Sequence, residues 1–467
     1  MSSYPPLEVR KLPPPPPLRQ AIGVGIVVLG LGIGTGELIL WPHLVVKHGL
    51  SLLWLALLGI GFQAILNHEI ARHQLATGEG FFTSSARVIK YSVYFWLLAA
   101  IILYVWPGWA SAIGTILKEL FGFGDHYVWS LLTLGLVLVL TFSGRVAYVL
   151  LERSLKILVP LFFALLVTIS FYNLSASDLI ATLKGTLSFG QIPDGVDINV
   201  LLTAVVFAGA GGMMNLAVSL WYRDKQMGMG MYAGRITNPV TGKDEAVAAT
   251  GYKFDENDPE NQRHWRGWMR FVRIDQGVIF FGLGFTTLLL LAANAYAVLK
   301  PRGIVPEGLD VAVAQAEIFG NVWGPVGSKL FLAMAFLMLF AVMWTIIDAL
   351  TRIVADIIHT NAKVGPHTKV FGFFNRFSLS KMYYGIIVLV VVAGALLLRT
   401  EQPLTLLVIT GVLGGLTMAI YTPLLIYLNN TQLPKPLRPS VIVNIAMGII
   451  SLFYLYFACK VIADKLF

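Results

Sequence analysis

Residues 20–48 form a run of mostly apolar residues that is interrupted at its middle by Gly34-Thr35-Gly36-Glu37. About 20 apolar residues are enough to cross a bilayer as a helix, so this run is long enough to span a membrane. A charged side chain at that depth costs roughly 2.5–3.5 kcal/mol on insertion scales, and a simple anchor would not carry it. The pattern predicts a discontinuous helix whose freed backbone and acidic side chain line a polar cavity.

The composition is that of a membrane protein along the whole chain. Of its 467 residues, 57% are hydrophobic and only 13% are charged, and the mean hydropathy is +0.74. These values lie outside the range of soluble domains. The net charge of +9 does not indicate a nucleic-acid partner, because the basic residues lie in loops between apolar runs. The lipid bilayer is therefore the expected partner, and no nucleic acid is expected.

Eleven apolar runs predict an all-α integral membrane protein of about eleven transmembrane helices. We expect a Pro-rich leader over 1–19, extended and without a cleavable signal peptide. The predicted helices lie near 20–48, 51–76, 93–117, 127–144, 147–173, 198–222, 273–298, 325–359, 380–399, 404–429 and 439–464. Lysine and arginine are concentrated in the loops that share a side with the N-terminus, above all 223–273. This asymmetry predicts a multi-pass protein of the cell membrane with its N-terminus in the cytoplasm and its C-terminus outside.

The loop 223–273 is the largest polar segment, and it has too few aliphatic residues to form a domain with its own core. Trp265, Trp268 and Phe271 are helically spaced and have basic neighbours. We expect this stretch to lie along the membrane surface, with partner binding as the alternative.

Internal symmetry gives the main architectural prediction. The sixth run contains a second glycine-rich interruption, Ala208-Gly209-Ala210-Gly211-Gly212-Met213-Met214-Asn215. It lies in the first helix of the second half, as the first interruption lies in the first helix of the chain. Two consecutive five-helix units, 20–173 and 198–429, must have opposite orientations because five is odd. Interrupted helices at matching positions of two inverted halves indicate a transport site at mid-membrane, and 439–464 is an additional helix.

These motifs resemble those of a known family. Gly34-Thr35-Gly36-Glu37 stands where the Nramp metal transporters carry Asp-Pro-Gly-Asn, and Met213-Met214-Asn215 stands where they carry Met-Pro-His. The stretch from Ala71-Arg72 to Ala76-Thr77-Gly78 is also similar to that family. The resemblance extends over roughly residues 20–460. It implies the 5+5 inverted-repeat fold of the leucine-type (LeuT-like) sodium symporters and of the amino acid–polyamine–organocation superfamily, with helices 1 and 6 unwound at mid-membrane.

The departures from the family motifs bear on the substrate. By position, Gly34 replaces the aspartate that ligates the metal in the family, Glu37 the asparagine and Asn215 the histidine, while Met213 keeps the thioether. Oxygen donors suit Mg²⁺ or Ca²⁺, whereas imidazole and sulfur suit manganese through zinc. The resemblance thus implies alternating-access transport of a hard divalent cation such as Mg²⁺, held by Glu37, Met213 and Asn215, with proton coupling left open.

A small organic solute of the amino acid or organic acid type remains the alternative. Glycines at the two interruptions leave volume and expose backbone groups, half-helix N-termini attract a carboxylate, and Glu37 would hold an ammonium group. For either substrate the predicted binding residues are Gly34, Thr35, Gly36, Glu37, Ala208, Gly209, Gly211, Gly212, Met213 and Asn215.

An enzyme is not expected. The sequence has no P-loop, no G-x-S-x-G motif and no cluster of cysteines, since Cys459 is its only cysteine. Without an ATP-binding motif, transport would be secondary, driven by an ion gradient or by the gradient of the substrate itself. We expect no cofactor apart from a transported cation, and a monomer.

Four further polar residues are candidates for ion or proton coupling. His68 and Glu69 lie on the second helix, where they are either structural or proton-conducting. His68 and His73 are five residues apart, so they diverge by about 140° around a helix and do not chelate one zinc ion from one face. In the related fold the eighth helix packs on the first, which makes Thr345 and Asp348 coupling candidates. An ion pair between Asp348 and Arg352, one turn on, is the structural alternative.

Overall fold

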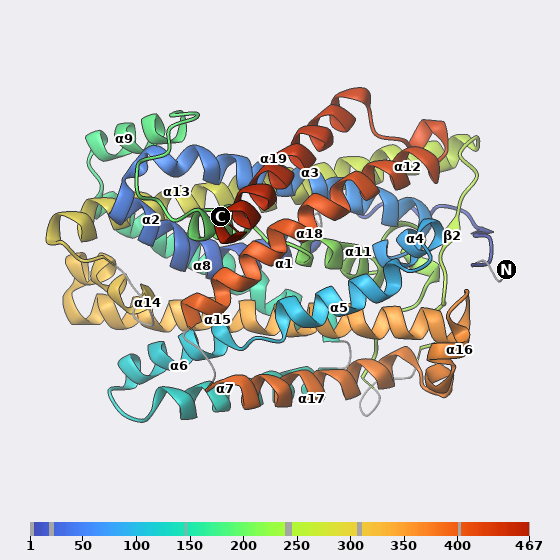
Figure 1. The fold of residues 1–467 in the computed structure, drawn as a ribbon, viewed down its shortest axis with the longest axis horizontal. Helices are drawn as coiled ribbons and strands as arrows, with labels where there is room; N and C mark the ends of the chain where they lie inside the picture. Colours follow the sequence, from blue (N-terminus) through green and yellow to red (C-terminus); the bar gives the residue numbers. More distant parts are fainter. Residues whose placement is uncertain are drawn as a thin grey trace.

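The computed structural model describes residues 4–17, 23–144, 147–238, 245–305, 311–399 and 403–466. Figure 1 shows a bundle of long helices that run roughly along one direction. Ten helical segments of the described chain are long and apolar enough to cross a membrane. An eleventh crossing is made by two short helices in line, α10 (Ile198–Val206) and α11 (Met214–Asp224). Each predicted transmembrane run therefore corresponds to a helical crossing.

The first half of the bundle contains crossings one to five. Their helices are α1 (Val24–Gly32), η2 (Ile33–Leu40), α2 (Trp41–His48), α3 (Leu53–Thr77), α5 (Ser92–Tyr104), α6 (Gly108–Phe121), α7 (His126–Ser143) and α8 (Ala147–Asn173). The third crossing is two helices instead of the single one predicted over 93–117. Pro107 lies between them, and proline lacks the N–H that would continue the helix.

The second half begins with α10 and α11 and continues to the C-terminus. Its other crossings are η5 (Arg273–Leu283), α13 (Gly284–Asn294), η6 (Ala295–Leu299), α15 (Ala316–Lys363), α17 (Leu379–Leu397), α18 (Pro403–Thr431) and α19 (Val441–Leu466). Within α15, Gly324 leaves the helical conformation just before Pro325, so the crossing proper starts where the sequence predicted it.

Short elements connect the crossings. They are β1 (Glu8–Val9), η3 (Leu50–Leu52), α4 (Phe81–Val88), α9 (Ala176–Thr186), η4 (Gly228–Tyr232), β2 (Tyr252–Lys253), α12 (Pro259–Val272), η7 (Lys300–Arg302), α14 (Val311–Ala314), α16 (Thr368–Phe371), η9 (Gly372–Arg376) and η10 (Lys435–Leu437). One end of the bundle, which we call the basic face, contains residues 4–17, α4, β2 and α16 (Figure 1). The other end contains α9 and α14.

The first crossing is the centre of the bundle. Every residue of α1 is buried, and α1 contacts α8, α15 and η5. Peripheral helices instead expose large apolar side chains, such as Leu389 and Leu396 on α17 and Ile442 and Leu452 on α19. Figure 1 shows α17 and α19 on opposite sides of the bundle. This arrangement is that of a protein whose outer surface contacts lipid and whose interior holds the polar groups.

The N-terminal segment is held against the basic face by hydrogen bonds. β1 pairs in parallel with β2, and the Trp268 indole donates to the carbonyl of Pro13 at 2.8 Å. The buried Tyr4 hydroxyl donates to Asn361 at 2.6 Å, and burial raises the pKa of Tyr4 to about 12, so it stays a neutral donor.

The aromatic residues of α12 lie inside the protein. Trp265, Trp268 and Phe271 are 7%, 3% and 0% exposed. The prediction that this stretch lies along the membrane surface is therefore wrong. A helical pattern of aromatic residues does not distinguish a membrane surface from a protein surface, and here residues 4–17 cover part of α12.

Candidate functional site

The first crossing stays helical through its glycines. Ile33–Leu40 forms a π-helix, with hydrogen bonds one residue longer than in an α-helix, and the residues before and after it have helical backbone angles. The prediction that this helix is unwound near 34–37 is therefore wrong. The glycines widen the helix without opening it, and single π-helical turns of this kind are frequent at functional sites.

The sixth crossing is broken as predicted. α10 ends at Val206 and α11 starts at Met214. Between them, Gly211 (φ +78°) and Gly212 (φ +54°) adopt left-handed backbone conformations, which only glycine takes at no steric cost. The predicted binding residues Ala208, Gly209, Gly211, Gly212 and Met213 all lie in this break.

The break and the first crossing are in direct contact. A Cβ at Gly32 would lie 3.2 Å from the Cα of Gly209, and a Cβ at Gly36 would overlap the carbonyl oxygen of Phe207. This confirms that the two glycine-rich segments face each other. Gly34 instead lies against Val342 of α15, and the side chain of Thr35 is outside the described part of the structure.

Two side chains bind the freed backbone of the break. Gln63 of α3 donates to the carbonyl of Val206 at 2.8 Å and accepts from the N–H of Gly211 at 2.9 Å. The Tyr104 hydroxyl accepts from the N–H of Met214 at 3.2 Å and donates to the carbonyl of Gly211 at 3.3 Å. Gln63 and Tyr104 thus provide hydrogen-bond partners for backbone N–H and C=O groups that lipid could not satisfy. Sequence reasoning missed both, although an amide within an apolar run was a usable signal for Gln63.

Glu37 is completely buried. Neither of its carboxylate oxygens has a hydrogen-bond partner among the described residues. Its Oε1 lies 3.7 Å from the position a Cβ would take at Gly284, where Leu29 and Ile60 also pack. An isolated carboxylate charge in such surroundings is strongly unfavourable unless a cation, a proton or polar neighbours compensate it.

The other two predicted ligands lie beside the break. Met213 and Asn215 are both 0% exposed. Asn215 donates from Nδ2 to the Tyr421 hydroxyl of α18 at 3.0 Å, and its Oδ1 has no hydrogen-bond partner in the described structure. Glu37 faces α13, whereas Asn215 contacts α18, so the structure does not join these side chains in one coordination shell. Within the described residues, no group of three or more His, Cys, Asp or Glu is placed to hold a metal ion.

The coupling candidates of the eighth helix have local partners. The Thr345 hydroxyl donates to the carbonyl of Ala341 in its own helix at 2.7 Å. Asp348 accepts from the Arg352 Nε at 2.6 Å, from the Trp221 indole at 3.0 Å and from the Tyr383 hydroxyl. Asp348 is thus in the ion pair expected from the sequence, and it ties the sixth, eighth and ninth crossings together.

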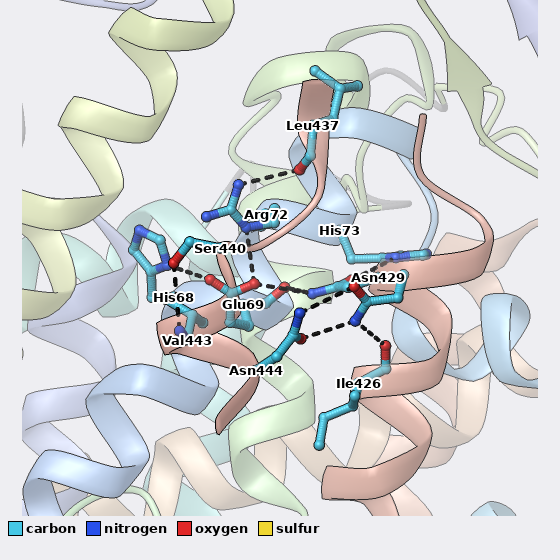
Figure 2. Close-up of polar contacts among 11 residues, drawn as sticks. His68, Glu69, Arg72, His73, Ile426, Asn429, Leu437, Ser440, Val443 and Asn444 are labelled. Atoms are coloured by element: carbon cyan, nitrogen blue, oxygen red, sulfur yellow. Dashed lines mark hydrogen bonds and ion pairs between the residues drawn. The ribbon is translucent and has the colours of Figure 1, made fainter. Parts of the chain in front are cut away.

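His68 and Glu69 belong to a polar cluster between the second, tenth and eleventh crossings (Figure 2). Glu69 is bonded at 2.8 Å to the Nδ1 of His68 through one oxygen and to the Nε of Arg72 through the other. The Nε2 of His68 has no partner in the described structure. The cluster borders a groove of about 210 Å³ lined by Ala64, Ile65, His68, Glu69, Arg273, Gln276, Gly277 and Val443.

The first crossing is fixed at the basic face by Asp275. Its carboxylate accepts from the N–H groups of Gly23 at 2.9 Å and Gly25 at 2.8 Å, and from the Tyr222 hydroxyl at 2.6 Å. A carboxylate at the N-terminus of a helix satisfies free N–H groups and complements the helix dipole. Next to it Lys225 pairs with Glu152. Together with the contact at Gly36, these bonds hold the first crossing against the sixth and seventh crossings.

Replacing Asp275 with alanine is expected to free the start of the first crossing. Loss of a helix cap costs about 0.5–2 kcal/mol, which corresponds to a roughly 2- to 30-fold increase in opening. With Cys459 replaced by alanine, maleimide labelling of cysteine at the buried Val27 would rise accordingly. Asp178→Ala, which removes the carboxylate of the capping box at the start of the peripheral helix α9, should leave labelling unchanged. Equal labelling in both variants would contradict the conclusion that Asp275 holds the start of the first crossing in place.

Comparisons with known proteins show the fold. No family model matches the chain, and no curated protein matches it. The chain is similar to a mutant of the Eremococcus coleocola manganese transporter, with a TM-score of 0.68 and 14% identity over 98% of this chain and 90% of the other. It is also similar to MHP1, a nucleobase-cation-symport-1 family transporter, with a TM-score of 0.56 and 12% identity over 94% and 90% of the two chains.

These similarities, together with the ten membrane-length helices of the described residues, confirm the predicted fold class, an all-α membrane protein with the LeuT-like fold. The correction for the first helix given above stands. At such low identity the similarities show the fold alone. Membership of the Nramp family stays a prediction.

Proposed function

We propose that this protein is a secondary active transporter that moves a hard divalent cation, in the first place Mg²⁺, by alternating access. The observation that carries the proposal is Glu37. It is a fully buried carboxylate without a hydrogen-bond partner among the described residues, on the crossing that packs against the broken sixth helix. A charge at this depth needs compensation, which a bound cation would provide, and residues of this kind mark ion pathways in membrane proteins.

The available donors favour a hard cation. Besides Glu37, a cation between the two segments would draw its donors from the carbonyl of Phe207, the unpartnered Oδ1 of Asn215 and the thioether of Met213, which helix movement has to bring together. Mg²⁺ prefers oxygen ligands and keeps part of its water shell, so it does not require all donors to touch it. The likeness in fold to a manganese transporter supports divalent-cation transport in general.

Movement of the first crossing would give access to the site. The contact between Gly36 and Phe207 has to open before a cation can lie between the two segments. Release of the Asp275 cap would open the site toward the basic face, which the positive-inside rule assigns to the cytoplasm. We propose that an ion gradient, or the gradient of the cation itself, drives this cycle.

A small organic solute is the second candidate. Its support is the break itself, which exposes backbone beside the N-terminus of α11. Gly209, Gly211 and Gly212 are closely packed in this structure, so their neighbours would have to move apart before a solute could bind there. The fold is shared with a transporter whose structure holds bromovinylhydantoin, an organic ligand. Glu37 would then pair with an ammonium group of the solute.

Uptake into proteoliposomes separates these functions. We expect uptake of Mg²⁺, little uptake of Mn²⁺ or Cd²⁺, and none of a panel of amino acids and organic acids, because imidazole is absent and sulfur is scarce among the donors. Calorimetry should show only weak Mn²⁺ binding. Micromolar Mn²⁺ affinity would reject the hard-cation proposal, and uptake of an organic solute without Mg²⁺ uptake would establish the second candidate.

A further inference from the structure

We propose that His73 binds the proton that accompanies the transported cation, and that Ser84 and Glu79 complete this proton-binding site. The inference rests on the proposed function for its role in transport, but the proton site itself is defined by the structure. His73 lies near the end of α3 at the basic face, is 3% exposed, and was set aside as a zinc ligand from the sequence.

The hydrogen bonds of His73 assign its tautomer. Asn429 of α18 donates from Nδ2 to the carbonyl of Glu69 at 3.1 Å and to its carboxylate at 3.2 Å, so the Oδ1 of Asn429 faces His73. That oxygen lies 3.0 Å from the Nδ1 of His73 and can only accept. Nδ1 therefore carries a hydrogen whether the ring is neutral or charged (Figure 2). This assignment follows from the network of partners.

Nε2 is the position that gains the proton. It lies 2.9 Å from the Ser84 hydroxyl oxygen, which in turn lies 3.2 Å from a carboxylate oxygen of Glu79. With a neutral ring, the hydroxyl donates to Nε2. When Nε2 takes up a proton it donates to the hydroxyl oxygen instead, and the hydroxyl hydrogen turns to Glu79.

Both states are fully hydrogen-bonded. Glu79 also accepts from Arg87 at 2.6 Å and from the N–H of Gly251 at 3.2 Å, so it does not depend on Ser84. Binding of one proton at His73 therefore requires only the rotation of one hydroxyl. Neither protonation state leaves a ring nitrogen without a partner. The charge that the ring gains is opposed by the carboxylate of Glu79, which lies one hydroxyl group away.

The charged groups around His73 are already paired, each acid with an arginine. On the same helix as His73, Glu69 pairs with Arg72. Glu79, just before α4, pairs with Arg87 of α4, and Asp356 of α15 pairs with Arg223 of α11. The facing residue of α18 is the neutral Asn429, and the loop before β2 contributes the backbone N–H of Gly251. A change in the charge of His73 therefore breaks none of these ion pairs, whereas protonation of any of the carboxylates would break one.

The site joins helices that carry the transport machinery. α3 holds the broken helix through Gln63 and bears His73 farther along, while Asn429 belongs to the tenth crossing. Any movement of α18 away from α3 removes the acceptor of the Nδ1 hydrogen and changes the proton affinity of His73. Proton binding and helix position are therefore linked thermodynamically, in both directions.

The first test measures Mg²⁺ and proton flux in the same proteoliposomes, with a Mg²⁺ indicator and a pH dye inside. In His73→Gln we expect proton movement per Mg²⁺ to fall to the leak seen in protein-free liposomes, while Mg²⁺ still enters down its own gradient. His126→Gln, at an exposed histidine of the opposite end, is the control. Unchanged proton movement in His73→Gln would overturn the proposal. If His73→Gln does not fold, Ser84→Ala takes its place.

The second test does not need transport. In the purified protein with ¹⁵N-labelled histidine, spectra are recorded from about pH 8 to pH 4, on both sides of the ordinary pKa of histidine. The His73 signal, identified by its loss in His73→Gln, should pass from the Nδ1–H neutral form to imidazolium as the pH falls. Ser84→Ala should change the midpoint of this signal and leave that of His126 unchanged. A His73 signal that stays in one form over this range rejects the proton site. If His73 titrates but the protein moves no Mg²⁺, the proton site stands and the magnesium proposal fails.

Discussion

Glu37→Gln is expected to reduce cation uptake by about 30- to 4,000-fold while leaving the protein folded. Loss of one partner of a buried charged pair costs about 2–5 kcal/mol, and every change of about 1.4 kcal/mol is tenfold. Glutamine has nearly the same size as glutamate and removes only the charge. Because Glu37 has no hydrogen-bond partner among the described residues, the substitution breaks no bond seen in the structure. Thermal unfolding should therefore be unchanged or shifted to higher temperature.

The comparison variant for this test is Glu119→Gln, at an exposed position of α6, which should take up Mg²⁺ like the wild type. Both proteins would be reconstituted at equal density and assayed under the same gradient. Full uptake in folded Glu37→Gln would show that the carboxylate is structural. A variant that no longer folds would instead mean that Glu37 stabilises the backbone of the first crossing.

Gly36→Ala is expected to damage both stability and transport. The added methyl would overlap the carbonyl oxygen of Phe207, a backbone atom that cannot rotate away as a side chain would. Overpacking of this kind usually costs about 1–3 kcal/mol. The first crossing and the break would be forced apart, so we expect both a lower unfolding temperature and loss of uptake.

A matched glycine serves as the control. At Gly135 in α7 an added Cβ would have no atom within 4 Å. Gly135→Ala should stabilise its helix by up to about 1 kcal/mol through helix propensity alone, and transport should persist. If Gly36→Ala unfolds at the wild-type temperature and retains uptake, then close approach of the two segments is not needed for function.

The sequence alone determined the membrane class, the crossings and the break in the sixth helix. These features follow from local properties: runs of apolar residues fix where a helix can cross, and consecutive glycines at 211 and 212 allow left-handed backbone that no other residue adopts easily. The pairing of Asp348 with Arg352 was likewise readable, because residues four apart lie on one face of a helix.

Only the tertiary structure decided what the polar residues of these helices contact. Glycines at 32, 34 and 36 are compatible with an unwound helix or with a closely packed one, and the neighbours Gly209, Val342 and Phe207 decide for the second. The partners of the break, Gln63 and Tyr104, are more than 100 residues away from it, and Asn429 is 356 residues from His73. Contacts over such separations depend on how the helices assemble, and the local pattern of a sequence carries no record of that assembly.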